Sequence, residues 1–126
     1  MGAQDANAHE LMRTMLNKPL YVALREPANL ARMPALLEAH LRWMVAAERR
    51  GEVFASGPFV SDIDPPGALG GMTIVRASSA EEANEILVGD PFVKEGVVQV
   101  RIRKWLLMEG GFCVTVRLSD QSARLL

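Results

Sequence analysis

The feature that most constrains the fold is the order in which strand-like and helix-like segments follow one another. Strand-like segments rich in β-branched and apolar residues occupy Pro19–Arg25, Val53–Gly57, Gly71–Ala77 and Val97–Leu107. One helix begins at Pro34 and ends before Gly51, and a second spans Ala80–Val88. The order is therefore strand, helix, strand, strand, helix, strand. Two strand–helix–strand units joined by a central hairpin predict an α+β, ferredoxin-like antiparallel sheet with two helices on one face.

The two ends of the chain flank this core. Residues 1–18 are expected to be a flexible leader with one helical turn around His9 to Leu16, and residues 19–107 to form the ferredoxin-like domain. An extra strand is predicted at Phe112–Leu118, so that residues 108–126 extend the same domain. The sheet face without helices must be covered, and a second copy of the same sheet is the commonest solution. We therefore expect a homodimer.

Composition excludes several classes of protein. The 126 residues carry a net charge of −1 and only 6% aromatic residues, which argues against nucleic acid as a partner. No run of about eighteen apolar residues is present, so no membrane span is expected, and the start of the chain does not resemble a secretory signal. The single cysteine, Cys113, is interpreted as a small hydrophobe in a strand. It fits a reducing compartment, and a cytoplasmic location is expected.

A histidine interrupts the apolar stripe of the first helix. Helical periodicity places His40 in one stripe with Leu37, Leu41, Met44 and Ala47. A buried imidazole needs a hydrogen-bond partner, because leaving it unpaired costs about 1–3 kcal/mol. Periodicity alone favours a structural histidine bonded to a backbone carbonyl. The competing hypothesis is an acid/base residue set into a small pocket.

Other polar residues are candidates for the same site. Asp90 starts an Asp-Pro turn, where it is predicted to cap a short helix, and an aspartate beside a buried histidine can fix its tautomer. Ser56 lies at a strand end and is a weak nucleophile candidate, while Arg25 or Arg101 is a candidate substrate-binding residue. The loop from Pro58 to Gly71 is long enough to be a binding loop. No metal-ligand cluster, phosphate-binding loop or dinucleotide fingerprint occurs, so no cofactor or metal is expected.

Several motifs, taken in order, resemble the YCII-related family of the dimeric α+β barrel superfamily. They are Leu20-Tyr21-Val22, Ala39-His40-Leu41, Gly51, Ala55-Ser56-Gly57-Pro58, Gly71, Ser79-Ala80-Glu81-Glu82-Ala83, Gly89-Asp90-Pro91-Phe92 and Gly96-Val97. The resemblance covers about residues 19–107. The leader 1–18 and the segment after Glu109 depart from the short form of the family.

The resemblance implies a ferredoxin-like protomer that dimerises sheet to sheet, with a His-Asp active site in a pocket beside the sheet. Carried over to this chain, the pair is His40 and Asp90, Gly57 and Pro58 shape the pocket wall, and Ser56 lies next to it. One type of member is similar to a dehydrochlorinase that acts on a chlorinated hydroxyhydroquinone without a cofactor. Related barrels include muconolactone isomerase.

Two functions from different classes follow from these observations. The first is a cofactor-independent lyase or isomerase on a small cyclic or aromatic-derived molecule, in which His40 moves a proton, Asp90 orients it and Arg101 holds an anionic group. The second is a non-catalytic dimeric binding or accessory protein in which a His40–Asp90 bond is structural. A haem- or quinone-handling monooxygenase is a weaker third option, because one histidine alone supplies no haem environment.

Overall fold

The computed structural model describes residues 3–125, with side chains from residue 7 onward, and the chain divides into two compact units. One unit is Pro19–Leu106. The other is formed by the two ends of the chain, up to Lys18 and from Leu107 onward. Among residues 3–125, no helix combines the length and the apolar character needed to cross a bilayer.

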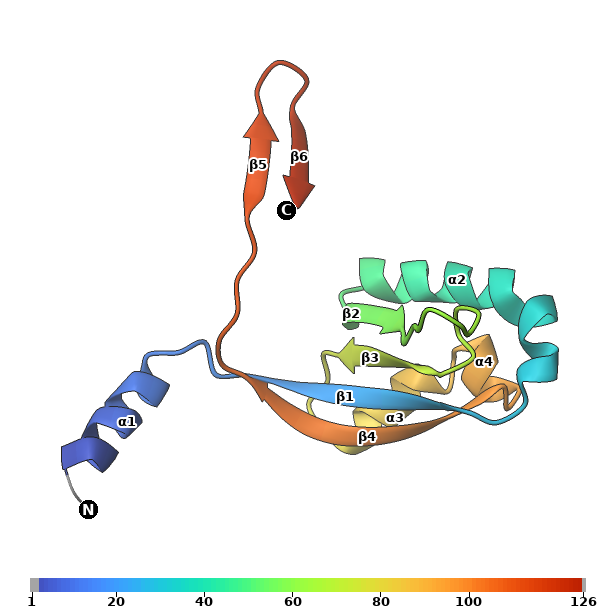
Figure 1. The fold of residues 1–126 in the computed structure, drawn as a ribbon, viewed down its shortest axis with the longest axis horizontal. Coiled ribbons are helices and arrows are strands. Elements are labelled where there is room, and N and C mark those ends of the chain that lie inside the picture. Colours follow the sequence, from blue (N-terminus) through green and yellow to red (C-terminus); the bar gives the residue numbers. More distant parts are fainter. Residues whose placement is uncertain (1–2, 126) are drawn as a thin grey trace. The chain divides into compact units, whose positions relative to one another are not determined.

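The central unit is built on a four-stranded antiparallel sheet (Figure 1). Its strands lie side by side in the order β2, β3, β1, β4, which is the order of a ferredoxin-like fold. The predicted α+β architecture is confirmed. The strands are β1 (Lys18–Pro27), β2 (Val53–Pro58), β3 (Gly71–Val75) and β4 (Val98–Leu107). The helices are the 3-10 turn η1 (Leu30–Arg32), α2 (Met33–Arg49), α3 (Ala80–Leu87) and the short α4 (Pro91–Lys94).

Side-chain alternation decides which face of the sheet is covered. Tyr21 and Ala23 of β1 and Val75 of β3 pack with Ala83 and Leu87 of α3 in the main core cluster. Trp43 of α2 packs against the same cluster, so both long helices cover this face. Because side chains alternate along a strand, every second residue of β1 and β3 points to the opposite face. They are Val22, Leu24, Met72 and Ile74.

The helix ends follow the predicted capping chemistry. Ser79 precedes α3, and its hydroxyl accepts a hydrogen bond from the Glu82 backbone N–H at 3.1 Å. Asp90 caps α4 in the same way, and Pro34 lies in the first turn of α2. Gly51 follows α2 with φ of +82°, a left-handed conformation that favours glycine. The prediction that Asp90 is a helix cap is therefore confirmed.

The apolar stripe of α2 differs from its predicted burial. Ala47 is fully buried, but Leu37 and Leu41 are 44% and 52% exposed. Both leucines line a cavity beside β2 rather than the packed core. The prediction of one continuous buried stripe was therefore wrong, because periodicity identifies the face of a helix but not whether atoms fill the space opposite it.

The unit formed by the chain ends contains more regular structure than predicted. Helix α1 spans Ala3–Arg13, where only a single turn was expected. Strand β5 (Val114–Arg117) pairs with β6 (Ser122–Leu125) in a separate two-stranded sheet. The extra strand therefore does not join the central sheet, and β6 was missed because its sequence, Ser-Ala-Arg-Leu, is short and has a charged centre. That residues 108–126 extend the domain, and that the leader is flexible, stay predictions.

Cys113 is another correction within this unit. It lies just before β5 rather than inside a strand, and it is exposed. The predicted strand began at Phe112, two residues before β5. The interpretation of Cys113 as a small hydrophobe within a strand was therefore wrong, because strand ends are the least certain part of a pattern-based prediction.

Gly70, the last residue of the loop between β2 and β3, lies close to the backbone of β1. It has φ of +76°, and a Cβ atom there would lie 2.0 Å from the carbonyl oxygen of Arg25.

We expect Gly51→Ala to cost about 1–2 kcal/mol from backbone strain alone, since nothing lies within 4 Å of its added Cβ. Gly70→Ala adds a steric clash and is expected to cost about 1–3 kcal/mol more. Urea unfolding of both variants measures the difference, and equal costs would contradict the close approach.

Candidate functional site

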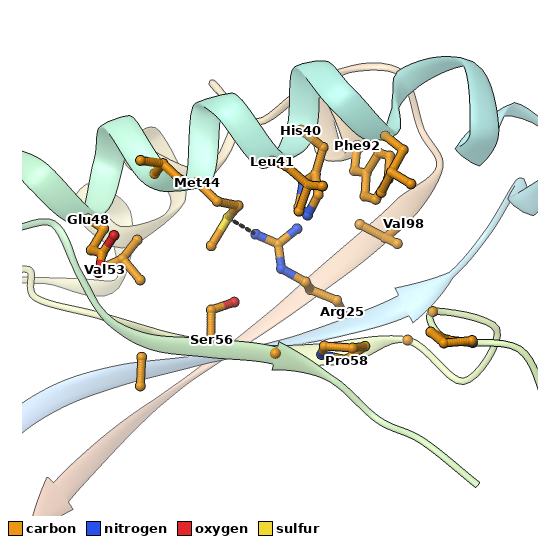
Figure 2. A pocket seen from close by; sticks show the side chains of 18 of the residues that line it. Arg25, His40, Leu41, Met44, Glu48, Val53, Ser56, Pro58, Phe92 and Val98 are labelled. Atoms are coloured by element: carbon orange, nitrogen blue, oxygen red, sulfur yellow. Dashed lines mark hydrogen bonds between the residues drawn. The ribbon is translucent and has the colours of Figure 1, made fainter. Parts of the chain in front are cut away.

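A cavity of about 510 Å³ lies between α2 and β2 in the central unit (Figure 2). Its walls are mostly apolar, and the polar side chains among them are few. Those of Arg25, His40, Glu48 and Ser56 line it. Helix α2 contributes a row of apolar side chains, and the loop before β3 closes part of the rim. These wall residues include Leu37, Leu41, Met44, Val45, Pro66, Gly67 and Gly70.

The structure brings His40 and Asp90 together at one side of this cavity. His40 projects from the middle of α2, and Asp90 is the residue that caps α4. The His40 Nδ1 atom lies 2.8 Å from Asp90 Oδ1, although the two residues are fifty positions apart in the chain. Asp90 is completely buried, whereas the His40 side chain keeps 14% of its surface exposed. The carboxylate thus holds one side of an imidazole whose other side borders the cavity.

Arg25 supplies the charge that balances Asp90. It lies near the end of β1 with its side chain on the helix-covered face, and its Nη1 atom donates to Asp90 Oδ2 at 2.6 Å. The Arg25 side chain is 7% exposed. A buried ion pair needs further hydrogen bonds to offset its desolvation, and Arg25 Nε donates one to Thr73 Oγ1 at 2.7 Å. Both charged groups of the ion pair therefore have further hydrogen-bond partners, Thr73 for Arg25 and His40 for Asp90.

Asp90 is held in its ionised form. Burial raises the pKa of its carboxyl group, but the hydrogen bond from His40, the positive charges of Arg25 and His40 and the Phe92 backbone N–H together lower that pKa below the usual value of 3.8. The Phe92 N–H lies 3.0 Å from Asp90 Oδ1. Three donors thus converge on one buried carboxylate, which makes the anion more stable than the acid.

The ionised carboxylate fixes the tautomer of neutral His40. A carboxylate only accepts hydrogen bonds, so the proton of the neutral ring must sit on Nδ1. Nε2 is then an unprotonated acceptor. It has no partner among the described residues, and no buried side-chain nitrogen or oxygen there lacks one, so Nε2 is open to the cavity. His40 therefore presents a base to whatever occupies the cavity.

Phe92 orients the histidine ring. The two rings stack in parallel, with centroids 3.9 Å apart and an interplanar angle of 5°. Phe92 also donates its backbone N–H to the same carboxylate oxygen that binds His40. The short α4 therefore fixes both the partner and the plane of the imidazole.

The other sequence-predicted site residues divide into two groups. Ser56, Gly57 and Pro58 at the end of β2 line the cavity. Arg101 is not among the lining residues. It lies at an odd position of β4, on the face away from the helices, where its exposed side chain bonds Glu26 at 3.1 Å. Arg25, the alternative basic residue, is the one that the structure places at the cavity.

Thr73 and Phe92 were not predicted as site residues from the sequence. Thr73 is fully buried on β3, where it accepts from Arg25 and lies 2.8 Å from Ser56 Oγ. The available signal was a hydroxyl within the otherwise apolar strand Gly-Met-Thr-Ile-Val, at the same parity as the core residue Val75. For Phe92 the signal was an aromatic residue directly after Asp-Pro. Neither pattern identifies a spatial partner.

The described residues contain no cluster of potential metal ligands. Among the described residues, no three His, Cys, Asp or Glu side chains are grouped as metal ligands would be. Asp62 and Asp64, in the loop before β3, are exposed, and Asp64 accepts a hydrogen bond from Ser61. His9 is exposed on α1.

The family of the chain is decided by a match over most of its length. The model of the YCII-related domain matches residues 19–106, which is the span predicted from the sequence motifs to within one residue. The chain belongs to the YCII-related family. The match contains His40, Asp90, Arg25 and the whole of the cavity wall described above.

Comparison with solved structures supports the same fold. The chain is similar to 5-chloro-2-hydroxyhydroquinone dehydrochlorinase (TftG) from Burkholderia phenoliruptrix, whose structure is a complex with 2,5-dihydroxybenzoquinone. The TM-score is 0.57 at 21% sequence identity, and the match covers 68% of this chain and 92% of the other. A search of curated proteins finds no match.

Replacing the buried carboxylate tests its electrostatic role. Asp90→Asn leaves the buried Arg25 without its counter-ion, and we expect it to lower the free energy of unfolding by about 3–5 kcal/mol at pH 7. Since the folded-state pKa of Asp90 is lowered, its stabilisation is present above the unfolded pKa and is lost as pH falls through the folded pKa. Urea unfolding at several pH values below 5 measures this.

The free energies of unfolding of the wild type and of Asp90→Asn should therefore converge as the solution becomes acidic. Asp64→Asn, at an exposed loop position, serves as the control and should follow the wild type at every pH. A gap between wild type and Asp90→Asn that stays constant down to pH 2 would contradict an ionised Asp90.

Proposed function

We propose that this protein is a cofactor-independent lyase or isomerase that acts on a small cyclic or aromatic-derived molecule, with His40 as the acid/base residue. One observation carries the proposal. His40 bonds a buried, ionised carboxylate through Nδ1 while its Nε2 is open to an apolar cavity. This is the arrangement by which a carboxylate holds a histidine ready to accept a proton.

In the proposed reaction, His40 Nε2 removes a proton from a carbon next to a carbonyl group. The electron pair of the broken C–H bond moves toward the carbonyl oxygen and forms an enolate. Asp90 stabilises the imidazolium that results. The Arg25 guanidinium bonds Asp90 and also lines the cavity, so it is proposed to stabilise the negative charge on the enolate oxygen. Arg25, which lines the cavity, is thus proposed in place of Arg101 as the residue that holds the anionic oxygen.

Two outcomes follow from the same enolate. If His40 returns the proton to a different carbon, the product is an isomer of the substrate. If the enolate re-forms its carbonyl, its carbon–carbon electron pair can form a double bond to the neighbouring carbon while the bond from that carbon to a leaving group breaks. The leaving group departs with the electrons of the broken bond, and His40 keeps the proton. The second outcome is a dehydrochlorination when chloride leaves. TftG is a dehydrochlorinase, which supports the proposal at the level of reaction type.

The substrate is proposed to be mainly apolar. The cavity of about 510 Å³ falls within the range typical of small-molecule sites, and its walls are largely aliphatic and aromatic. A ring can pack along the leucines of α2, while its oxygen atoms meet Arg25, His40 and Ser56. We expect hydroxylated aromatics and lactones to stabilise the protein in a thermal-shift screen.

Removing the base should greatly slow the turnover of a substrate found in that screen. We expect His40→Ala to lower kcat by about 10²–10⁴-fold with little change in KM, because positioned acid–base catalysis contributes this much. His9→Ala replaces the other histidine, which is exposed on α1, and should leave kcat unchanged. Full activity of His40→Ala would refute the proposal.

A non-catalytic binding or accessory role is the second candidate. The observation that favours it is that His40 links α2 to α4, because its ring bonds Asp90, the cap of α4, and stacks on Phe92. A purely structural histidine lowers the melting temperature when removed, and no ligand then depends on the pair. A ligand whose stabilising effect disappears in Asp90→Asn would count against this candidate.

We also propose that the protein is a homodimer formed through the uncovered face of the central sheet. The centre of this face is apolar, formed by Val22 and Leu24 of β1 with Met72 and Ile74 of β3. Arg101 and Glu26 form an ion pair at 3.1 Å on the same face. An apolar sheet face flanked by charges is typical of an isologous dimer interface.

A charge placed in that apolar centre should prevent dimerisation. Leu24→Glu is expected to give a monomer in size-exclusion chromatography with light scattering, because dimerisation would bury one unpaired carboxylate from each subunit. Val88→Glu makes a similar change at an exposed position after α3 and should leave the dimer intact. A dimeric Leu24→Glu variant would exclude this face as the interface.

A further inference from the structure

The buried hydroxyl of Thr73 lies between two residues that line the cavity. Thr73 Oγ1 receives a hydrogen bond from Arg25 Nε at 2.7 Å and lies 2.8 Å from Ser56 Oγ. Thr73 is fully buried and does not itself line the cavity, whereas Arg25 and Ser56 do. The position of one proton on this hydroxyl determines what Ser56 presents to a ligand.

The donors and acceptors available to Thr73 determine the direction of the Thr73–Ser56 hydrogen bond. The guanidinium of Arg25 can only donate, so Thr73 accepts at that contact. The Thr73 O–H then needs an acceptor, and Ser56 Oγ is the one within hydrogen-bond distance among the described residues. If Ser56 donated instead, the Thr73 proton would be buried without a partner, which folded proteins rarely accept. Thr73 therefore donates to Ser56.

The hydroxyl proton of Ser56 is consequently free to point into the cavity. Ser56 has no other polar side-chain partner among the described residues, and Figure 2 shows its oxygen directed toward Arg25 below α2. Arg25 also has donor capacity left on the same side. Within the described part of the chain, its Nη2 atom has the Met44 sulfur, at 3.6 Å, as its sole hydrogen-bond partner, and sulfur is a weak acceptor.

We propose that Thr73 is a positioning residue that makes Ser56 a hydrogen-bond donor, so that Ser56 and Arg25 together bind one anionic oxygen of the ligand. A phenolate or enolate oxygen on an apolar ring fits this pair of donors, since the rest of the wall is apolar. His40 Nε2 is an acceptor and does not compete for that oxygen. The inference rests on the proposed function only for the location of the ligand, because it concerns binding and not turnover.

A chromogenic phenol tests the inference without knowledge of the substrate. The probe is 4-nitrophenol, whose phenolate and neutral forms absorb differently, and 4-nitroanisole is the matched ligand that cannot ionise. We expect the wild-type protein to bind 4-nitrophenol mainly as the phenolate. The bound probe then shows a larger ionised fraction than the free probe at the same pH.

Thr73→Val removes the hydroxyl and nearly preserves the shape of the side chain. We expect it to weaken phenolate binding about tenfold, because a charge-assisted hydrogen bond from Ser56 is no longer directed at the oxygen. Affinity for 4-nitroanisole should not change. Thr73→Ser restores the hydroxyl and should restore both the affinity and the ionised fraction of the probe.

A double substitution keeps the test valid if Thr73→Val also loses stability. Since Thr73 acts through Ser56, Thr73→Val combined with Ser56→Ala should bind 4-nitrophenol no more weakly than Ser56→Ala alone. Additive losses, unchanged phenolate binding in Thr73→Val, or equal loss of both ligands would each overturn the inference. Phenolate binding that survives His40→Ala separates this result from any failure of the proposed acid–base role.

Discussion

Asp90 carries the interaction on which the rest of the site depends. It is a fully buried carboxylate that accepts hydrogen bonds from His40, Arg25 and the backbone of Phe92, which belong to three different parts of the fold. A lone carboxylate in this position would be expensive to bury, so the protein places a guanidinium and an imidazole around it. These contacts join α2, the end of β1 and the start of α4 at one point. Stability and the orientation of His40 therefore have a common origin.

The ferredoxin-like topology explains why these segments meet. Strand β1 lies in the middle of the sheet, so Arg25 near its end is covered by helices. Thr73 lies on the neighbouring strand β3, in register with Ala23, which is two residues before Arg25. Helix α2 crosses over this face, and its apolar stripe faces β2 across a cavity rather than a packed layer. A polar network thus forms the floor of an otherwise apolar chamber. An apolar molecule bound there would displace water from these groups, and its electrostatic interactions with them would then be stronger than in water.

Much of the fold could be predicted because local signals agree with the tertiary structure. Pro34 and Gly51 mark the limits of α2, Ser79 caps α3, and the alternation in β4 indicates which side chains face the helices. The pairing of His40 with Asp90 followed from the family resemblance and not from periodicity, which favoured a structural histidine. The errors have physical causes as well. The exposure of Leu37 and Leu41 depends on an unfilled space, and β6 has almost no apolar pattern of its own.

The sequence by itself determined the order of the elements, their caps and turns, and the presence of a histidine and an aspartate at two defined places. These features depend on residues that are close together in the chain, where backbone geometry is fixed by local chemistry. Only the tertiary structure decided that Arg25 rather than Arg101 reaches the cavity, and that Thr73 connects Arg25 to Ser56. The two hydrogen bonds of Thr73 join residues that lie 48 and 17 positions apart, and they follow from the order in which the strands pair in the sheet rather than from any local preference.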